Sequence, residues 1–93
     1  MAAISRTIIK IKPGKEAEVE AYIDQKSSEI SSILGIKNWG VIYTDENELT
    51  VVAVYNNKED AEKATAFVNE VMADFVPLVA EQPVRKIFDA RWH

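Results

Sequence analysis

The hydrophobic positions of this 93-residue chain fall into two kinds of segment. In some stretches β-branched and aromatic residues dominate or alternate with polar ones, which is typical of strands. In others apolar residues recur at spacings of three and four, which predicts helices. The expected elements are a strand at 3–11, a helix at 15–32, strands at 36–44 and 48–56, a helix after Asn57, and a strand at 84–92.

Turn and capping residues mark the boundaries of these elements. Pro13-Gly14 ends the first strand, and Gly35 ends the first helix. The polar run 45–47 is predicted to join the second and third strands into a hairpin. Asn57, with an acidic residue three positions later, is a typical start of the second helix, which Pro77 breaks or kinks.

Each predicted helix has one apolar face. In the first helix this face consists of Val19, Tyr22, Ile23, Ile30, Ile33 and Leu34. In the second it consists of Ala61, Ala64, Phe67, Val68, Val71, Met72 and Phe75. Both faces are expected to pack against the sheet.

The element order βαββαβ predicts an α+β fold of the ferredoxin-like type, with a four-stranded antiparallel sheet and two helices on one of its faces. In this topology the first and third strands are central, and the last strand lies beside the first. The third strand is apolar on both faces between Val51 and Tyr55, although helices cover only one face. A homodimer that stacks sheet on sheet would cover the other face. We therefore expect a single domain over residues 1–93 that forms a dimeric α+β barrel.

Composition and charge narrow the range of functions. The net charge is -4, with basic chain ends and an acidic middle, which argues against a general nucleic-acid binder. The chain has no cysteine, and its one histidine is His93, so neither a thiolate site nor a His-rich metal centre is expected. No secretion signal or membrane-spanning apolar run is visible, so no membrane is expected as a partner and the cytoplasm is the default compartment.

Three short passages carry a resemblance to a known family. They are Ile11-Lys12-Pro13-Gly14-Lys15, Leu34-Gly35-Ile36, and Val54-Tyr55-Asn56-Asn57-Lys58-Glu59-Asp60-Ala61. Through them nearly the whole chain resembles the dimeric α/β-barrel superfamily, and within it the antibiotic-biosynthesis-monooxygenase-like domains. Active members of that group include cofactor-free oxygenases of aromatic polyketides and enzymes that degrade haem, while many members have no assigned activity.

The resemblance does not extend to the haem-degrading members. Those enzymes share an Asn, Trp and His set inside the barrel cavity. Here Asn38 and Trp39 are neighbours on one strand and must point to opposite faces, and His93 is the last residue. We therefore expect no haem, no metal and no other cofactor.

Several aromatic and amide side chains are candidates for a ligand site. Trp39 and Tyr43 share a face of the second strand and could form the wall of a pocket for a flat aromatic ligand, or could pack in the core or a dimer interface. Tyr55 stands where many members of the resembled family have tryptophan. Asn38, on the opposite face, could position dioxygen or a substrate carbonyl, or could be a hydrogen-bonded buried amide.

Basic residues gather on the first and last strands, which should be adjacent. Arg6 and Lys10 share a face of the first strand, and Arg85 and Arg91 share a face of the last strand with Asp89. These arginines could bind a carboxylate or phenolate. Alternatively, Asp89 pairs with an arginine across the strands, and the edge charges prevent sheet-to-sheet aggregation.

The combined hypothesis is a homodimeric, cofactor-independent monooxygenase that acts on a small aromatic or apolar molecule between sheet and helices. The alternative is a non-catalytic ligand-binding or stress-response dimerisation module. Asp89 and Tyr43 are the available groups for proton transfer. The candidate catalytic residues are Asn38, Trp39 and Asp89, and the candidate substrate-binding residues are Arg6, Tyr43, Tyr55 and Arg91.

Overall fold

The computed structural model describes residues 1–93 and contains the predicted elements in the predicted order. The elements are β1 (Ala2–Lys10), α1 (Glu16–Ser31), β2 (Ile36–Asp45), β3 (Glu48–Tyr55), α2 (Lys58–Lys63), α3 (Thr65–Ala73), a 3-10 turn (Val76–Leu78) and β4 (Val84–Ala90). Most boundaries agree with the expected ranges to within one residue, and β4 ends two residues earlier than expected, at Ala90.

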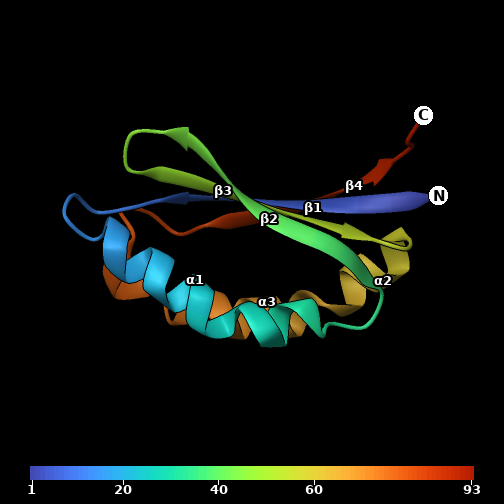
Figure 1. Cartoon of the computed structure of the whole chain (residues 1–93), viewed down its shortest axis with the longest axis horizontal. Coiled ribbons are helices and arrows are strands. Elements are labelled where there is room, and N and C mark those ends of the chain that lie inside the picture. Colours follow the sequence, from blue (N-terminus) through green and yellow to red (C-terminus); the bar gives the residue numbers. More distant parts are fainter.

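The strands form one four-stranded sheet in the order β2-β3-β1-β4, with every neighbouring pair antiparallel. This order confirms the ferredoxin-like topology, with β1 and β3 in the centre. The helices α1 and α3 lie side by side along one face of the sheet, and no helix covers the other face (Figure 1). We call this uncovered side the open face.

The second helical segment differs from the single helix that the sequence predicts. It is divided at Ala64 into α2 and α3, and Pro77 lies in the 3-10 turn that follows. The predicted cap is confirmed, because the Asn57 side chain accepts a hydrogen bond of 2.8 Å from the backbone N–H of Asp60. That bond satisfies one of the free N–H groups at the beginning of α2.

The core lies between the sheet and the helices, as the two apolar helix faces predict. Its largest fully buried side chains are Tyr55, Phe75, Ile9 and Val19, which come from both layers. Leu34 is an exception, because its side chain is 84% exposed. The reason is that α1 ends at Ser31, so that Leu34 lies in the following turn and does not continue the apolar stripe of the helix.

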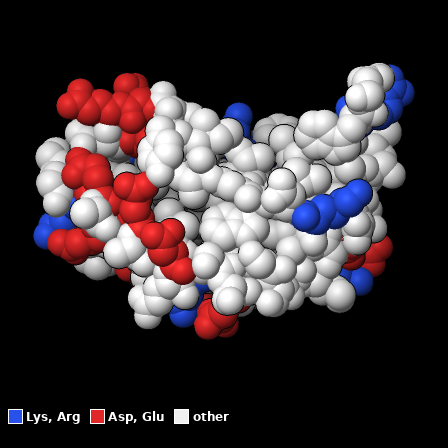
Figure 2. Space-filling model, viewed as in Figure 1, with Lys and Arg blue, Asp and Glu red and all other residues white.

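Different charges predominate at the two ends of the face shown in Figure 2. Acidic side chains gather over the β2–β3 turn and the first part of α1, and basic side chains are visible at the other end, beside the C-terminus (Figure 2). The long axis between these ends measures 39 Å. None of the helices is both long and apolar enough to cross a lipid bilayer.

Candidate functional site

A cavity lies between the covered face of the sheet and the helices. Side-chain alternation in β1 turns Ser5 and Thr7 toward the helices, so that the floor of the cavity carries two hydroxyl groups. In the ladder Ser5 is opposite Ala53, whose small side chain leaves space above the sheet. The cavity volume is about 50 Å³.

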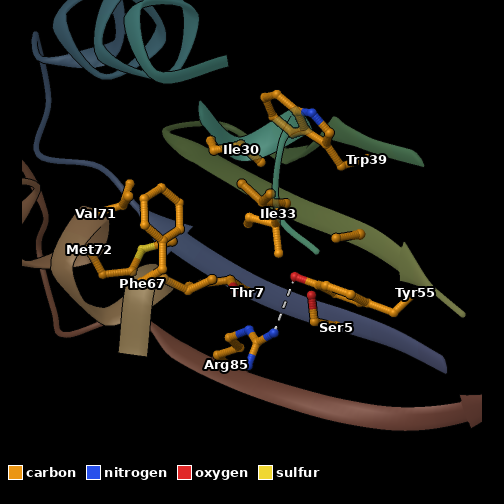
Figure 3. Close-up of a pocket in the computed structure, with 13 residues that line it drawn as sticks. Ser5, Thr7, Ile30, Ile33, Trp39, Tyr55, Phe67, Val71, Met72 and Arg85 are labelled. Atoms are coloured by element: carbon orange, nitrogen blue, oxygen red, sulfur yellow. Dashed lines mark hydrogen bonds between the residues drawn. The ribbon is translucent and has the colours of Figure 1, made fainter. Parts of the chain in front are cut away.

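Apolar side chains from α1, α3 and β2 enclose the cavity (Figure 3). Phe67 and Met72 of α3 close one end, and Trp39 of β2 lies toward the other. The full lining consists of Ser5, Thr7, Ile30, Ile33, Trp39, Val51, Ala53, Tyr55, Phe67, Val68, Val71, Met72 and Arg85. The site is thus an apolar cavity with a small group of polar atoms on the sheet side.

The strongest polar feature of the cavity is the partly buried Arg85. Its guanidinium donates to Thr65 Oγ1 at 2.9 Å, to the backbone oxygen of Ala61 at 2.9 Å and to the Tyr55 hydroxyl at 3.4 Å. None of the four ion pairs of the structure includes Arg85. A positive charge is therefore held in a fixed orientation by neutral groups, which suits it to a planar anion.

Tyr55 brings a second polar atom to the same place. Its side chain is 1% exposed, and the Arg85 guanidinium carbon lies 5.9 Å from its ring centre. The Tyr55 hydroxyl accepts from Arg85, and its own proton can still be donated to a ligand. Arg85 and Tyr55 are joined by a hydrogen bond in Figure 3, with Ser5 close to both.

Trp39, Tyr43 and Tyr55 all lie on the covered face of the sheet, and two of them reach the cavity. Trp39 and Tyr55 line it, and the Trp39 indole N–H donates to Ser31 Oγ at 2.8 Å, which fixes the ring against α1. Tyr43 points outward instead, is 69% exposed, and donates its hydroxyl to Glu20. That hydrogen bond raises the pKa of the Tyr43 hydroxyl above its usual range.

The other four predicted site residues lie away from the cavity. Asn38 points to the open face, opposite to Trp39, as the sequence predicts. Arg6 also lies on the open face, where its guanidinium carbon is 5.3 Å from the centre of the Phe88 ring. Asp89 is exposed and forms none of the ion pairs of the structure, and Arg91 follows the end of β4.

One prediction about side-chain direction was wrong. Strict alternation along the predicted second strand puts Ile36 on the same face as Asn38, but the β2–β3 register shifts between these residues, and Ile36 pairs with Tyr55. Lys37 is an extra residue of β2 that has no partner in β3. Ile36, which precedes it, therefore points to the face opposite to the one that alternation predicts.

Arg85 is the one charged residue that lines the cavity, and it was not among the candidate site residues. The sequence does indicate this position, because side chains alternate along the last strand. Arg85 and Ile87 therefore share one face, and Lys86 lies on the other. The structure shows that Thr7 pairs with Arg85 while Arg6 pairs with Lys86. The basic residues of β1 and β4 are therefore divided between the two faces and do not form one patch.

No family model matches the chain, and no curated protein matches it. Solved structures do match it. A conserved protein from Methanosarcina mazei has a TM-score of 0.83 at 15% identity, over 98% of this chain and 94% of the other. SnoaB from Streptomyces nogalater, a cofactor-independent oxygenase, has a TM-score of 0.77 at 14% identity, over 99% and 95%.

A third structure, from Bordetella bronchiseptica, is named as a candidate antibiotic biosynthesis monooxygenase. It has a TM-score of 0.79 at 18% identity, over 98% of both chains. Identities this low establish a shared fold and leave function open. The chain therefore has the same ferredoxin-like fold as these structures, among which are proteins named as antibiotic biosynthesis monooxygenases.

Proposed function

We propose that this protein binds a small aromatic molecule with an acidic enol or phenol between sheet and helices, and oxygenates it without a cofactor. The observation that carries this proposal is the guanidinium of Arg85, which borders an apolar cavity and has no carboxylate partner. An uncompensated cation in such surroundings favours the ionised form of a bound acid. The similarity to the SnoaB structure adds support from the fold alone.

The chemistry requires few groups from the protein. Arg85 and the Tyr55 hydroxyl donate to the oxygen of the substrate enolate, and the apolar wall with Trp39 holds the ring. The ionised carbon transfers electrons to dioxygen. One oxygen atom remains on the carbon and the other leaves as water, so that a CH2 group and O2 become a C=O group and H2O. The substrate itself supplies all the electrons.

The substrate must also be acidic enough to ionise with little help. Neither a carboxylate nor an imidazole is among the residues that line the cavity. Asp89 lies on the same face of β4 as Arg85 but four residues further along, a separation of about 13 Å. A proton from a molecule held at Arg85 would therefore pass to water and not directly to Asp89.

The proposal includes a homodimer formed through the open face. This face is uncovered in Figure 1 and carries apolar side chains along all four strands, among them Ile4, Ile42, Val52 and Phe88. A two-fold axis that crosses the long axis of the sheet would bring the acidic end of one copy to the basic end of the other. Charge complementarity and apolar surface thus both favour a second copy.

Oxygen consumption with 1,8-dihydroxyanthrone tests the catalytic proposal, since this probe has an acidic CH2 group beside a ring ketone. We expect one O2 to be consumed for each anthraquinone formed, faster with protein than without it. Arg85→Met should abolish the acceleration. Lys86→Met is the matched control, because Lys86 is the next residue on the strand and points to the open face. Equal rates with wild type and Arg85→Met would refute the proposal.

The small size of the cavity favours the non-catalytic alternative. About 50 Å³ accommodates a few water molecules, whereas ligand sites commonly measure about 300–1,000 Å³. A ligand-binding or stress-response dimerisation module would keep this interior as a filled core. Melting temperatures across a panel of phenols, naphthols and aromatic acids distinguish the two functions. A ligand of the native state raises the melting temperature, and no shift across the panel would favour the module.

A further inference from the structure

The inner cavity adjoins a larger hollow on the outside of the molecule. Thr7, Met72 and Arg85 line both the inner cavity and this outer hollow, whose volume is about 500 Å³. The hollow lies between the end of α3, the segment 76–83 and β4. Thr7 and Arg85 are direct partners in the ladder, and together with Met72 they form the boundary that the two spaces share.

The outer hollow differs in chemistry from the inner cavity. Two exposed amide side chains, Asn69 and Gln82, line it together with the rim residue Arg85. The acidic residue of the hollow, Glu81, forms an ion pair of 3.4 Å with Lys10, which reduces its repulsion of an anion. Neutral amides that both donate and accept hydrogen bonds therefore lie next to the guanidinium.

A second outer hollow meets the first at the same residues. It has a volume of about 700 Å³, and it too is lined by Asn69, Gln82 and Arg85. The inner cavity can hold only a small part of a ligand, whereas the outer space has the dimensions of a complete ligand site. Arg85 thus stands between a narrow apolar space and a wider one that has both polar and apolar walls.

We propose that the substrate site extends outward from Arg85, and that the substrate carries a neutral hydrogen-bonding substituent, such as an amide or hydroxyl group, which contacts Asn69 and Gln82. This inference rests on the proposed function, because both place an acidic group at Arg85. It adds the class of the substrate: an aromatic acid with an uncharged polar extension, of which only the apolar edge enters the inner cavity.

Binding of two matched probes, measured by titration calorimetry, tests this inference. Salicylate and 4-acetamidosalicylate share the acidic group and the ring, and differ by one neutral amide. We expect the acetamido compound to bind about 3- to 10-fold more tightly, as one or two added hydrogen bonds would produce. The double variant Asn69→Ala/Gln82→Ala should remove this difference while its affinity for salicylate stays the same. Gln25→Ala, an exposed amide on α1, is the control and should retain the difference.

The possible outcomes separate this inference from the proposed function. If salicylate binds and Arg85→Met abolishes its binding, while the acetamido group brings no advantage, the extension is wrong and the Arg85 site stands. If Asn69→Ala/Gln82→Ala leaves the advantage unchanged, the extension is equally refuted. If neither probe binds the wild-type protein, or if Arg85→Met binds both probes as well as wild type does, the proposed function is refuted, and the extension is refuted with it. Circular dichroism of each variant checks that it has folded.

Discussion

Arg85 and Tyr55 hydrogen-bond across the sheet, from two strands that are not neighbours of each other. Arg85 is level with Thr7 on one side of β1, and Tyr55 is level with Ala3 on the other. The 3.4 Å contact between their side chains therefore passes diagonally over Ser5, which lies between them in the strand. A small side chain at position 5 is what leaves room for this contact.

Substitution of Arg85 should separate ligand binding from stability. We expect Arg85→Met to weaken binding of aromatic acids at least about 10-fold, because a charge-assisted hydrogen bond is lost. The free energy of unfolding should stay within about 1 kcal/mol, since methionine fills similar space and removes a partly buried charge without a counter-ion. Calorimetric titration and urea denaturation measure the two effects. A large loss of stability with unchanged binding would give Arg85 a structural role.

Met72 should control the size of ligand that the cavity admits. Met72→Ala joins the inner cavity to the outer hollow, and we expect it to raise the preference for 2-naphthol over phenol about 10-fold, because a second ring can then be buried. The cost in stability should be about 1–3 kcal/mol, since Met72 is only partly buried. Leu34→Ala, at an exposed position, is the control. An unchanged ratio of affinities would show that Met72 is not the barrier.

Gly35 should be the least replaceable glycine of the chain. It has a φ of +84°, and a Cβ atom there would lie 2.6 Å from Asp60 Cγ. Gly14 has nearly the same φ, +83°, but open space around it. We expect Gly14→Ala to cost about 1 kcal/mol of unfolding free energy and Gly35→Ala about 2–4 kcal/mol.

Chemical denaturation of both glycine variants measures the difference. Adding Asp60→Ala to Gly35→Ala should recover part of the loss, because the contacting side chain is then removed. Equal costs at the two glycines would mean that the Asp60 carboxylate moves aside freely.

The ionisation of Tyr22 should make the protein less stable at high pH. Burial, together with a hydrogen bond to Asp74 and the charges of Asp74 and Glu29, raises the pKa of Tyr22 to about 12 from 10.0. Because this pKa is higher in the folded state, the neutral Tyr22 stabilises the fold. This contribution to the free energy of unfolding is fully present below about pH 10 and is lost as the pH rises to about 12. Absorbance at 295 nm should show a tyrosine that titrates near pH 12.

Variants of this pair provide the control for the tyrosine titration. Tyr22→Phe should remove the phase near pH 12, and Asp74→Asn should move it toward lower pH without restoring the ordinary value, because burial remains the largest cause. A tyrosine spectrum with no phase near pH 12 would contradict the assignment. The hydrogen bond to Glu20 also raises the pKa of Tyr43, so Tyr22→Phe should keep one tyrosine that titrates above the usual pH.

Phe88 should be essential for association through the open face. It is 41% exposed, its ring is stacked beside Arg6, and it lies among apolar side chains of the sheet. We expect wild-type protein to sediment as a dimer at micromolar concentration and Phe88→Glu to weaken the dimer at least about 30-fold. Leu34→Glu changes a still more exposed residue outside this face and should leave the dimer intact. A wild-type monomer would overturn the proposal.

The fold could be predicted from local patterns, whereas the site required the spatial order of the strands. Alternation correctly placed Asn38 and Trp39 on opposite faces and Arg85 on the face of Ile87. Alternation gave the wrong face for Ile36, because β2 contains an extra, unpaired residue that no feature of the sequence indicates. The division of the second helix at Ala64 has no strong local cause either, since alanine favours a continuous helix.

The meeting of Arg85 with Tyr55 was beyond sequence reasoning for a different reason. The two residues are thirty positions apart, and both must first be placed on either side of β1. Arg6 and Arg91 seemed equivalent to Arg85 by charge and position on basic strands. The register, in which Arg6 pairs with Lys86 and Thr7 with Arg85, separates Arg85 from Arg6, and the end of β4 at Ala90 separates it from Arg91.

The strand order also determines how protection from hydrogen exchange is distributed over the candidate site. Tyr55 belongs to a central strand that is paired on both sides, whereas Arg85 belongs to β4, an edge strand paired on one side only. Edge strands open more readily than central ones, so backbone amides of β4 should exchange with solvent faster than those of β1 and β3. A ligand that binds both side chains would link the edge strand to the centre of the sheet. Its binding would therefore slow hydrogen exchange of the β4 amides, although the ligand makes no contact with the β4 backbone.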